Sequence, residues 1–217
     1  IKTIAERNGV EMYDVYTGFK WIANVMRENE GKKNYIGGGE ESYGFLCEDF
    51  VRDKDAVSAC VILAEIAAWA KDQGLSLYQL LQKIYVEYGF SKEKGISVVK
   101  KGKSGAEEIE AMMKKFRENP LTEIAGSKVT YFYDYSTLKG KDYAENETVT
   151  LDMPTTSNVL QYFTEDNTKV SIRPSGTEPK IKFYCEVHSK VKSIDELPEA
   201  EKAAEEKINQ IKASLGI

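Results

Sequence analysis

The sequence is poor in the residues on which several classes of protein depend. Among its 217 residues are three cysteines and one histidine. The cysteines, Cys47, Cys60 and Cys185, are odd in number and far apart, so they form neither a disulfide framework nor a metal-binding pair. This use of cysteine is typical of a reducing compartment, and we expect a cytoplasmic protein. The single His188 has no neighbouring nucleophile and no metal-ligand spacing, which favours a structural role.

Long apolar runs and an excess of positive charge are also missing. No stretch approaches the ~18 consecutive apolar residues expected of a membrane span, and the densest apolar run, residues 56–70, is interrupted by Ser58 and Glu65. The formal net charge is −5, so no global field attracts nucleic acid or an anionic membrane. We therefore expect neither as a partner. An anionic ligand has to be held by a local cluster of donors.

The first 95 residues alternate helical and strand patterns, and apolar residues recur at helical spacing in several segments. The predicted helices cover residues 19–26, 55–71 and 76–88, and the predicted strands cover residues 10–15 and 35–36. Alternation of this kind predicts an α/β partial domain, with helices around a mixed and largely parallel sheet. The chain opens within a helical pattern and without an initiator methionine, so we expect a fragment of a longer protein.

Residues 96–217 show strands in succession, flanked by helices. The predicted strands cover residues 96–99, 128–135, 159–163, 169–172 and 180–187, and the predicted helices cover residues 106–117 and 197–215. The tripeptide Glu165-Asp166-Asn167 is a hairpin turn signal between two of these strands. The pattern predicts a smaller α+β domain, with an antiparallel sheet and helices on one face. We place the boundary after residue 95, in a stretch rich in glycine and lysine.

A tight loop joins the last two predicted strands, and its composition suits a phosphate. Arg173 offers a planar, charged donor fork, and Ser175 and Thr177 add hydroxyl donors. Gly176 allows the backbone amides to turn inward and form an anion-binding nest. We interpret these residues as phosphate ligands. The alternative is an ordinary surface turn in which Arg173 pairs with Glu178.

A second loop, Gly37–Gly44, is rich in glycine yet acidic. Carboxylates repel phosphate, but they accept hydrogen bonds from neutral hydroxyls. Glu40 and Ser42 are two residues apart and project to the same side of an extended backbone. We interpret the loop as a sugar-binding loop. The alternative is a glycine-rich turn with solvated glutamates.

Basic residues and a hydroxyl-bearing turn lie near the acidic loop in the sequence. Arg52 and Lys54 follow it in the segment Arg-Asp-Lys-Asp, and Thr17 and Gly18 precede it. Asp55 is placed to cap the helix that comes next. A capped, charged helix start explains these basic residues equally well when they are taken alone. Their closeness to an acidic loop favours a substrate site.

Four of these segments resemble the α-D-phosphohexomutase superfamily, which comprises phosphoglucomutases and phosphomannomutases. Gly39–Gly44 is similar to its sugar-specificity loop, and Arg173–Pro179 is similar to its C-terminal phosphate-binding loop. Arg52–Asp55 resembles the basic segment after the sugar loop, and Thr17–Trp21 resembles a turn of the phosphoglucomutase branch. The segments occur in the family order and span nearly the whole chain.

The resemblance implies most of the third domain and all of the fourth domain of a four-domain enzyme. Such an enzyme moves a phosphoryl group between the 1- and 6-positions of a hexose through a phosphoserine and a hexose 1,6-bisphosphate intermediate. Mg²⁺ binds beside that serine. Neither the serine loop nor the metal loop of the family occurs in this sequence, so we expect a fragment that is inactive alone and works with upstream domains. We assign it no catalytic nucleophile and no metal ligand.

The resemblance also assigns roles to single residues. The sugar loop contacts hydroxyls of the hexose, Lys54 neutralises charge near the substrate and assists the reaction, and the Arg173 loop holds the phosphate that is not reacting. The expected substrate-binding residues are Thr17, Gly18, Glu40, Ser42, Arg52, Lys54, Arg173, Ser175, Gly176 and Thr177.

Two positions depart from the patterns of some relatives. Tyr43 stands where many mannomutases carry glycine, which favours glucose as the sugar, and Lys182 stands where some relatives carry arginine. The alternatives are a phosphomannomutase, an enzyme of dual specificity, and a non-catalytic module that binds sugar phosphates.

Overall fold

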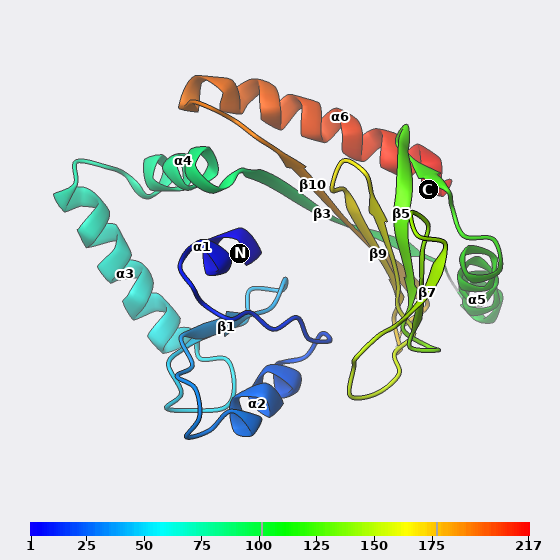
Figure 1. The fold of residues 1–217 in the computed structure, drawn as a ribbon, viewed down its shortest axis with the longest axis horizontal. Coiled ribbons are helices and arrows are strands. Elements are labelled where there is room, and N and C mark those ends of the chain that lie inside the picture. Colours follow the sequence, from blue (N-terminus) through cyan, green and yellow to red (C-terminus); the bar gives the residue numbers. More distant parts are fainter. Residues whose placement is uncertain (101, 177) are drawn as a thin grey trace. The chain divides into compact units, whose positions relative to one another are not determined.

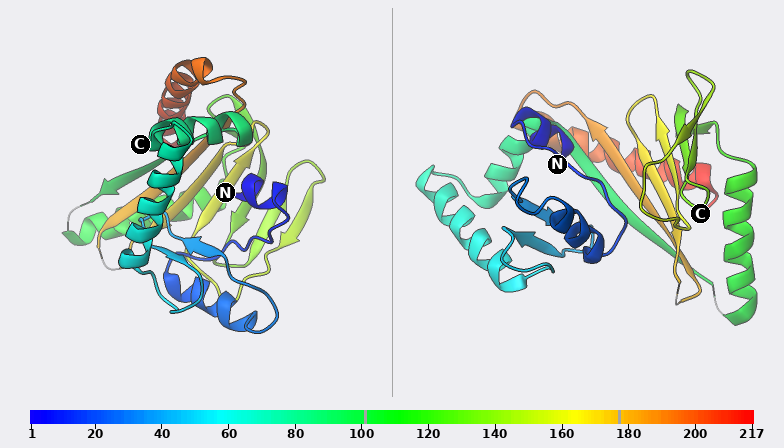
Figure 2. Two further views of the ribbon diagram at one scale, coloured as in Figure 1. Left: turned by 90° about the vertical axis from the view of Figure 1, so that its left-hand side faces the viewer. Right: turned by 60° about the horizontal axis from the view of Figure 1, so that its bottom comes forward.

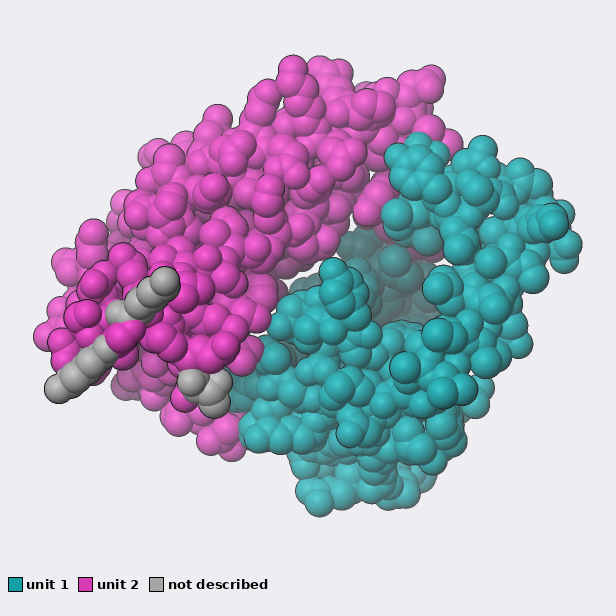
Figure 3. Space-filling model, turned by 180° about the vertical axis from the view of Figure 1, so that it is seen from behind, with its two compact units in different colours: residues 1–84 teal, residues 85–217 magenta. Residues whose placement is uncertain are grey.

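The computed structural model describes residues 1–100, 102–176 and 178–217. The chain forms two compact units, Ile1–Ile84 and Tyr85–Ile217 (Figure 3). The predicted boundary after residue 95 falls inside strand β3 (Phe90–Val99), and the units divide earlier. Strand β3 pairs along its whole length with a strand of the second unit, so its hydrogen bonds hold residues 90–99 to that unit.

The first unit combines helices with one short strand pair. Its helices are α1 (Lys2–Arg7), α2 (Phe19–Glu28), α3 (Ala56–Asp72) and the beginning of α4 (Leu77–Tyr88), and its strands are β1 (Gly37–Gly39) and β2 (Phe45–Cys47). Phe19, Met26 and Leu46 form a small buried core, against which Ile22 packs. The predicted apolar face of the helix at residues 19–26 is therefore confirmed.

The strand predictions for this unit were partly wrong. Strand β1 pairs with β2 in antiparallel register, because a connection of residues 40–44 is too short for the crossover that parallel strands need. The residues 10–15 form no strand, since the alternating pattern there finds no neighbouring strand to pair with. The short strand expected at residues 35–36 lies instead at the glycines that follow.

Side-chain caps fix where two helices of the chain begin. The Asp55 carboxylate accepts a hydrogen bond from the Ser58 amide at 2.8 Å, at the start of α3. Before α4, the Gln79 amide donates to the Ser76 hydroxyl (3.2 Å) and the Ser76 amide donates to the Gln79 side chain (2.8 Å). This reciprocal pair is a capping box. Both caps confirm the predicted helix starts.

The second unit is built around an eight-stranded sheet (Figures 1 and 2). Its main path runs β3-β10-β9-β8-β5-β6-β7, with β4 on β5, and all neighbouring strands are antiparallel. Besides β3, its elements are α5 (Gly102–Glu118), β4 (Glu123–Ile124), β5 (Ser127–Asp134), β6 (Lys139–Asp142), β7 (Glu147–Thr150), β8 (Leu160–Thr164), β9 (Lys169–Pro174), β10 (Lys180–Ser189), a 3-10 turn (Ile194–Glu196) and α6 (Leu197–Leu215). The antiparallel sheet is confirmed, whereas β4, β6 and β7 were not predicted and β3 is longer than the predicted residues 96–99.

One face of this sheet forms the core of the second unit. Along β10, Ile181, Phe183, Cys185 and Val187 are buried, and the residues between them are not. Apolar residues of α5 and α6 join the same core cluster, so both helices cover this one face, as predicted. Figure 1 shows α6 running along β3 and β10. Burial raises the pKa of the Cys185 thiol to about 11, so Cys185 acts as a small core residue.

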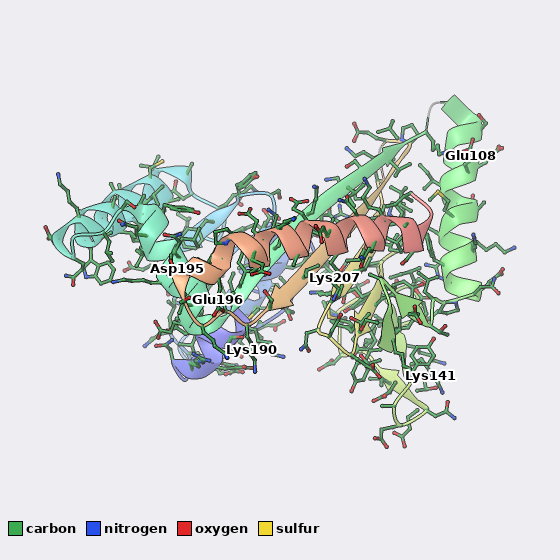
Figure 4. All side chains as sticks on the ribbon, turned by 90° about the horizontal axis from the view of Figure 1, so that it is seen from above. Glu108, Lys141, Lys190, Asp195, Glu196 and Lys207 are labelled. Atoms are coloured by element: carbon green, nitrogen blue, oxygen red, sulfur yellow. The ribbon has the colours of Figure 1, made fainter. Side chains whose placement is uncertain are left out.

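The turn between β8 and β9 ties the sheet to α6. Asp166 accepts hydrogen bonds from the hydroxyls of Thr164 (2.7 Å) and Thr168 (2.9 Å), and it pairs with Lys207 of α6, labelled in Figure 4. Burial alone raises the pKa of Asp166, but the hydrogen bonds from Lys207 and the two threonines outweigh it and hold the pKa well below its ordinary value. The predicted hairpin turn is confirmed.

Replacing Asp166 by asparagine is expected to lower the free energy of unfolding by about 1 kcal/mol at neutral pH, because solvent screens a side chain that is 43% exposed. The pKa of Asp166 is lower in the folded than in the unfolded chain. Its stabilisation is therefore present above about pH 4 and is lost as the pH falls through the folded-state pKa. Urea denaturation of both proteins across this range measures the effect. A difference that does not change with pH would contradict it.

Candidate functional site

The acidic loop forms the turn of the β1–β2 hairpin. The Glu40 amide donates to the Gly44 carbonyl at 2.8 Å, and the Tyr43 amide donates to the Glu40 carbonyl at 3.2 Å. Tyr43 has a φ of 70°, in the left-handed region, and its side chain is 98% exposed. Ser42 is exposed as well. The turn therefore presents Ser42 and Tyr43 to solvent.

The carboxylate of Glu40 is turned inward and joins two other predicted segments. Its side chain is 10% exposed. One oxygen, Oε1, accepts a hydrogen bond from the Gly18 amide at 3.0 Å, and the other, Oε2, lies 3.7 Å from Nζ of Lys54. Because a carboxylate has about four acceptor positions, Glu40 can accept further hydrogen bonds from hydroxyl groups. Three residues that are far apart in sequence thus meet in one cluster.

Lys54 lies between two carboxylates. Its Nζ is 3.6 Å from Asp53 as well as near Glu40, and it lies 5.8 Å from the ring centre of Phe19. The neighbouring Asp55 amide donates to the carbonyl of Phe45 at 3.0 Å, which holds this segment against β2. The position of Lys54 is therefore fixed by the backbone on one side and by Glu40 on the other.

Two other predicted residues of this unit are placed differently. Arg52 forms its ion pair with Glu30 at 2.7 Å. Thr17 precedes Gly18 and is exposed. Sequence reasoning gave little weight to Gly44, although the cluster depends on it. A Cβ atom at Gly44 would lie 2.7 Å from both Glu40 Oε2 and Lys54 Cδ.

Replacing Gly44 by alanine is expected to open the contact between Glu40 and Lys54. Both crowded atoms belong to side chains that can move, so the free energy of unfolding should change by less than about 1 kcal/mol, while the carboxylate shifts away from Gly18. The Gly18 amide resonance in a ¹⁵N-labelled chain reports that movement. Gly95→Ala is the control, since a Cβ there meets nothing within 4 Å. An unchanged Gly18 resonance in Gly44→Ala would be the opposing result.

The proposed phosphate loop connects β9 to β10 and is held at both ends. The Ser175 amide donates to the Lys180 carbonyl at 2.8 Å, and the Lys100 amide donates to the Pro179 carbonyl at 2.9 Å. Within the loop, the Ser175 hydroxyl accepts from the Glu178 amide at 3.2 Å. Gly176 is exposed, and Thr177 lies outside the described residues.

Two cations face each other at the base of this loop. Arg173 on β9 is paired in register with Lys182 on β10, so their side chains share one face of the sheet. Across the described part of the chain, neither forms an ion pair with a carboxylate. Glu178 pairs with Lys180 and not with Arg173, and the hydrogen bond from Lys180 lowers the pKa of Glu178. Like charges directly opposite each other are destabilising, and an anion bound between them would relieve that repulsion.

Metal-ligating side chains are scattered over the described residues. No group of three or more His, Cys, Asp or Glu side chains within the described ranges is arranged to hold a metal ion. In the same ranges no helix is both long and apolar enough to cross a bilayer. His188 has Nε2 3.0 Å from the Glu186 carboxylate, and the two lie on the same strand.

Comparison with known protein families gives two matches that follow each other along the chain. Residues 1–88 match the family model described as phosphoglucomutase/phosphomannomutase, alpha/beta/alpha domain III. Residues 97–204 match the model described as phosphoglucomutase/phosphomannomutase, C-terminal domain. Together the two matches cover nearly the whole sequence.

Relatives of known name are much longer than this chain. A phosphoglucomutase of Staphylococcus haemolyticus is 37% identical over 187 residues, which is 86% of this chain and 34% of the relative. A phosphoglucomutase of Staphylococcus aureus (strain bovine RF122 / ET3-1) is 40% identical over 183 residues, 84% of this chain and 33% of the relative. The chain thus spans about a third of the length of the curated relatives it matches.

A solved structure has a similar fold. It is the open form of pp63/parafusin, a phosphoglucomutase from Paramecium, with a TM-score of 0.56 and 20% sequence identity. The match covers 100% of this chain and 36% of that one.

Proposed function

Since the chain belongs to the phosphoglucomutase/phosphomannomutase family, we propose that it is the part of a phosphohexomutase that binds the sugar and the unreacting phosphate. The complete enzyme would interconvert hexose 1-phosphate and hexose 6-phosphate through a phosphoserine and a hexose 1,6-bisphosphate intermediate. The observation that carries the proposal is the pair of Arg173 and Lys182, which face each other beside a glycine-containing loop and form no ion pair with a carboxylate among the described residues. The small-molecule partners are hexose phosphates.

Phosphate binding is the role of the second unit. Arg173 would donate two parallel hydrogen bonds to phosphate oxygens, and Lys182 would add a point charge from the neighbouring strand. Ser175 and the amides around Gly176 would supply neutral donors, with Thr177 beside them. The phosphate held here does not react. The donors of the loop therefore only have to hold this phosphate in a fixed position, and none of them has to transfer a proton.

Sugar binding is the role of the first unit. The Glu40 carboxylate is already oriented by the Gly18 amide and by Lys54, so it can accept from a sugar hydroxyl without a large ordering cost. Ser42, exposed at the tip of the turn, would both donate and accept. Lys54 keeps the carboxylate neutralised and is the assisting residue in this proposal. Arg52 and Thr17 would take part as secondary contacts at the edge of the loop.

The chemical step belongs to upstream domains of the same protein in this proposal. The residues that the structure describes do not fit a Mg²⁺ site, since no suitable group of acids is present among them. Mg²⁺ and the phosphoserine would be held outside residues 1–217, and the protein would work in the cytoplasm. By itself this chain would bind hexose phosphate without converting it.

An activity assay on both forms of the protein tests this division. The 217-residue chain is expected to show no conversion of glucose 1-phosphate, whereas the full-length protein converts it to glucose 6-phosphate. Competition between glucose 1-phosphate and mannose 1-phosphate in the full-length protein measures the preferred sugar, and Tyr43, which stands where many mannomutases carry glycine, favours glucose. A full-length protein that binds glucose 1-phosphate but converts neither sugar would support a non-catalytic binding module instead.

A further inference from the structure

Aromatic side chains gather on the face of the eight-stranded sheet that the helices leave open. Helices α5 and α6 cover the other face, where the core of the second unit lies (Figure 1). Successive side chains of a strand point to opposite faces, so every second residue of β5 and β8 lies on the open face. The aromatic residues there are Tyr131, Tyr133, Tyr135 and Phe163, and all four are partly exposed.

Tyr133 lies at the centre of this aromatic cluster. Its ring centre is 5.2 Å from that of Phe163, 5.9 Å from that of Tyr131 and 6.4 Å from that of Tyr135. The ring also lies against Gly140, the residue opposite on β6, where a Cβ atom would collide with it. A ring that covers a glycine lies along the sheet, and its second face is turned away from the backbone. Tyr133 is therefore placed to stack on a flat ligand.

A polar pair lies between Tyr133 and the strand of Arg173. Gln161 on β8 is opposite Tyr133 on one side and Ser171 on the other. Its side-chain amide donates to the Ser171 hydroxyl at 3.0 Å and accepts from the Tyr135 hydroxyl at 2.8 Å. Such an amide has two N–H donors and an oxygen with two lone pairs, so Gln161 can also bond to the edge of a base. Two strand spacings of about 4.8 Å separate Tyr133 from β9, which leaves room for a ribose between a base and a phosphate.

The charge on the open face is uneven. Arg173 and Lys182, at the end near the loop, form no ion pair with a carboxylate among the described residues, and Lys182 lies 5.9 Å from the ring centre of Tyr184. Further along β9, Lys169 is neutralised by Glu186 at 3.8 Å. The face therefore suits a ligand that is anionic at one end. A nucleic acid strand, which needs cations along its length, does not fit.

We propose that the open face of the second unit binds a nucleoside diphosphate, with the phosphates at Arg173 and Lys182 and the base stacked on Tyr133. Gln161 bonds to the edge of the base. The inference rests on the proposed function, because it uses the phosphate site assigned there to the hexose phosphate. The two ligands therefore compete, and the nucleotide acts as an inhibitor of the complete enzyme.

Binding of ADP, UDP and pyrophosphate to the full-length protein tests this inference. Pyrophosphate offers the two phosphates without a base. We expect both nucleotides to bind about 10-fold more tightly than pyrophosphate, because a base gains about this much from stacking on an aromatic side chain, and to displace glucose 1-phosphate. Equal affinities for nucleotides and pyrophosphate, with glucose 1-phosphate still bound at Arg173, would overturn the inference alone. If neither pyrophosphate nor glucose 1-phosphate binds, the proposed function fails and the inference fails with it.

Substitutions at Tyr133 test where the base lies. Tyr133→Leu is expected to lower the affinity for ADP about 10-fold, whereas Tyr133→Phe keeps the ring and preserves it. Neither should change the affinity for glucose 1-phosphate. The control is Tyr78→Leu, at an exposed tyrosine of α4, which should change neither affinity. Phe163→Leu gives the same readout as Tyr133→Leu if that variant does not fold. An equal loss of ADP and glucose 1-phosphate affinity would mean that the rings support the loop itself, and would contradict a base site.

Discussion

Arg173→Ala is expected to weaken the binding of glucose 1-phosphate to this chain by about 10- to 100-fold. A hydrogen bond to a charged group contributes about 1.5–3 kcal/mol, and each 1.4 kcal/mol is about a factor of ten in affinity. Arg173 supplies the donor fork of the loop, and Lys182 on the neighbouring strand cannot replace it, because an ammonium group lacks the planar pair of donors. Titration calorimetry, or NMR for a weak ligand, measures the change.

The matched control is Arg27→Ala on α2. Arg27 is exposed and donates a hydrogen bond to Asn24 of its own helix, so its loss should leave the affinity unchanged. A loss of less than about threefold in Arg173→Ala, roughly 0.7 kcal/mol, would mean that the loop is a surface turn and not a phosphate site.

Phe183→Ala is expected to lower the free energy of unfolding of the second unit by about 3–5 kcal/mol. The Phe183 side chain is fully buried on β10 and meets Phe116 of α5 edge to face, with ring centres 6.2 Å apart. Truncation leaves a cavity between the sheet and α5 that the surrounding strands cannot close. Urea denaturation followed by circular dichroism measures the loss.

Phe50→Ala is the control of equal size change. Phe50 is 59% exposed in the first unit, and its truncation should cost less than about 0.5 kcal/mol. If Phe183→Ala costs no more than Phe50→Ala, then the helices do not pack on this face of the sheet in solution.

Residue periodicity was sufficient to predict strand β10 and helix α6 of the second unit. Strand β10 alternates buried and less buried residues along almost its whole length, and α6 begins and ends at the residues expected, Leu197 and Leu215. Both segments are long, and the apolar residues of each pack into the same core. Strands β6 and β7 escaped prediction because they are four residues long and mostly polar, so no apolar face distinguishes them from loops.

The local motifs of the site were visible in the sequence, but their contacts were not. Nothing in the order of residues indicates that Glu40 accepts from the amide of Gly18, 22 positions away. The register that sets Arg173 opposite Lys182 depends on the pairing of two strands. Such contacts are set by tertiary structure. The parallel sheet was expected because alternating helices and strands usually imply one, yet the strands that would form it are not among residues 1–84.

The proposed function depends most on the binding of a phosphate group at the Arg173 loop. The most direct measurement is an NMR titration of the ¹⁵N-labelled chain with glucose 1-phosphate, followed at every assigned backbone amide. We expect the largest shifts at Arg173, Ser175 and Gly176, with further shifts at Gly18 and Glu40, and we expect Arg173→Ala to remove those of the phosphate loop. Shifts confined to other residues, or a pattern unchanged in Arg173→Ala, would contradict it.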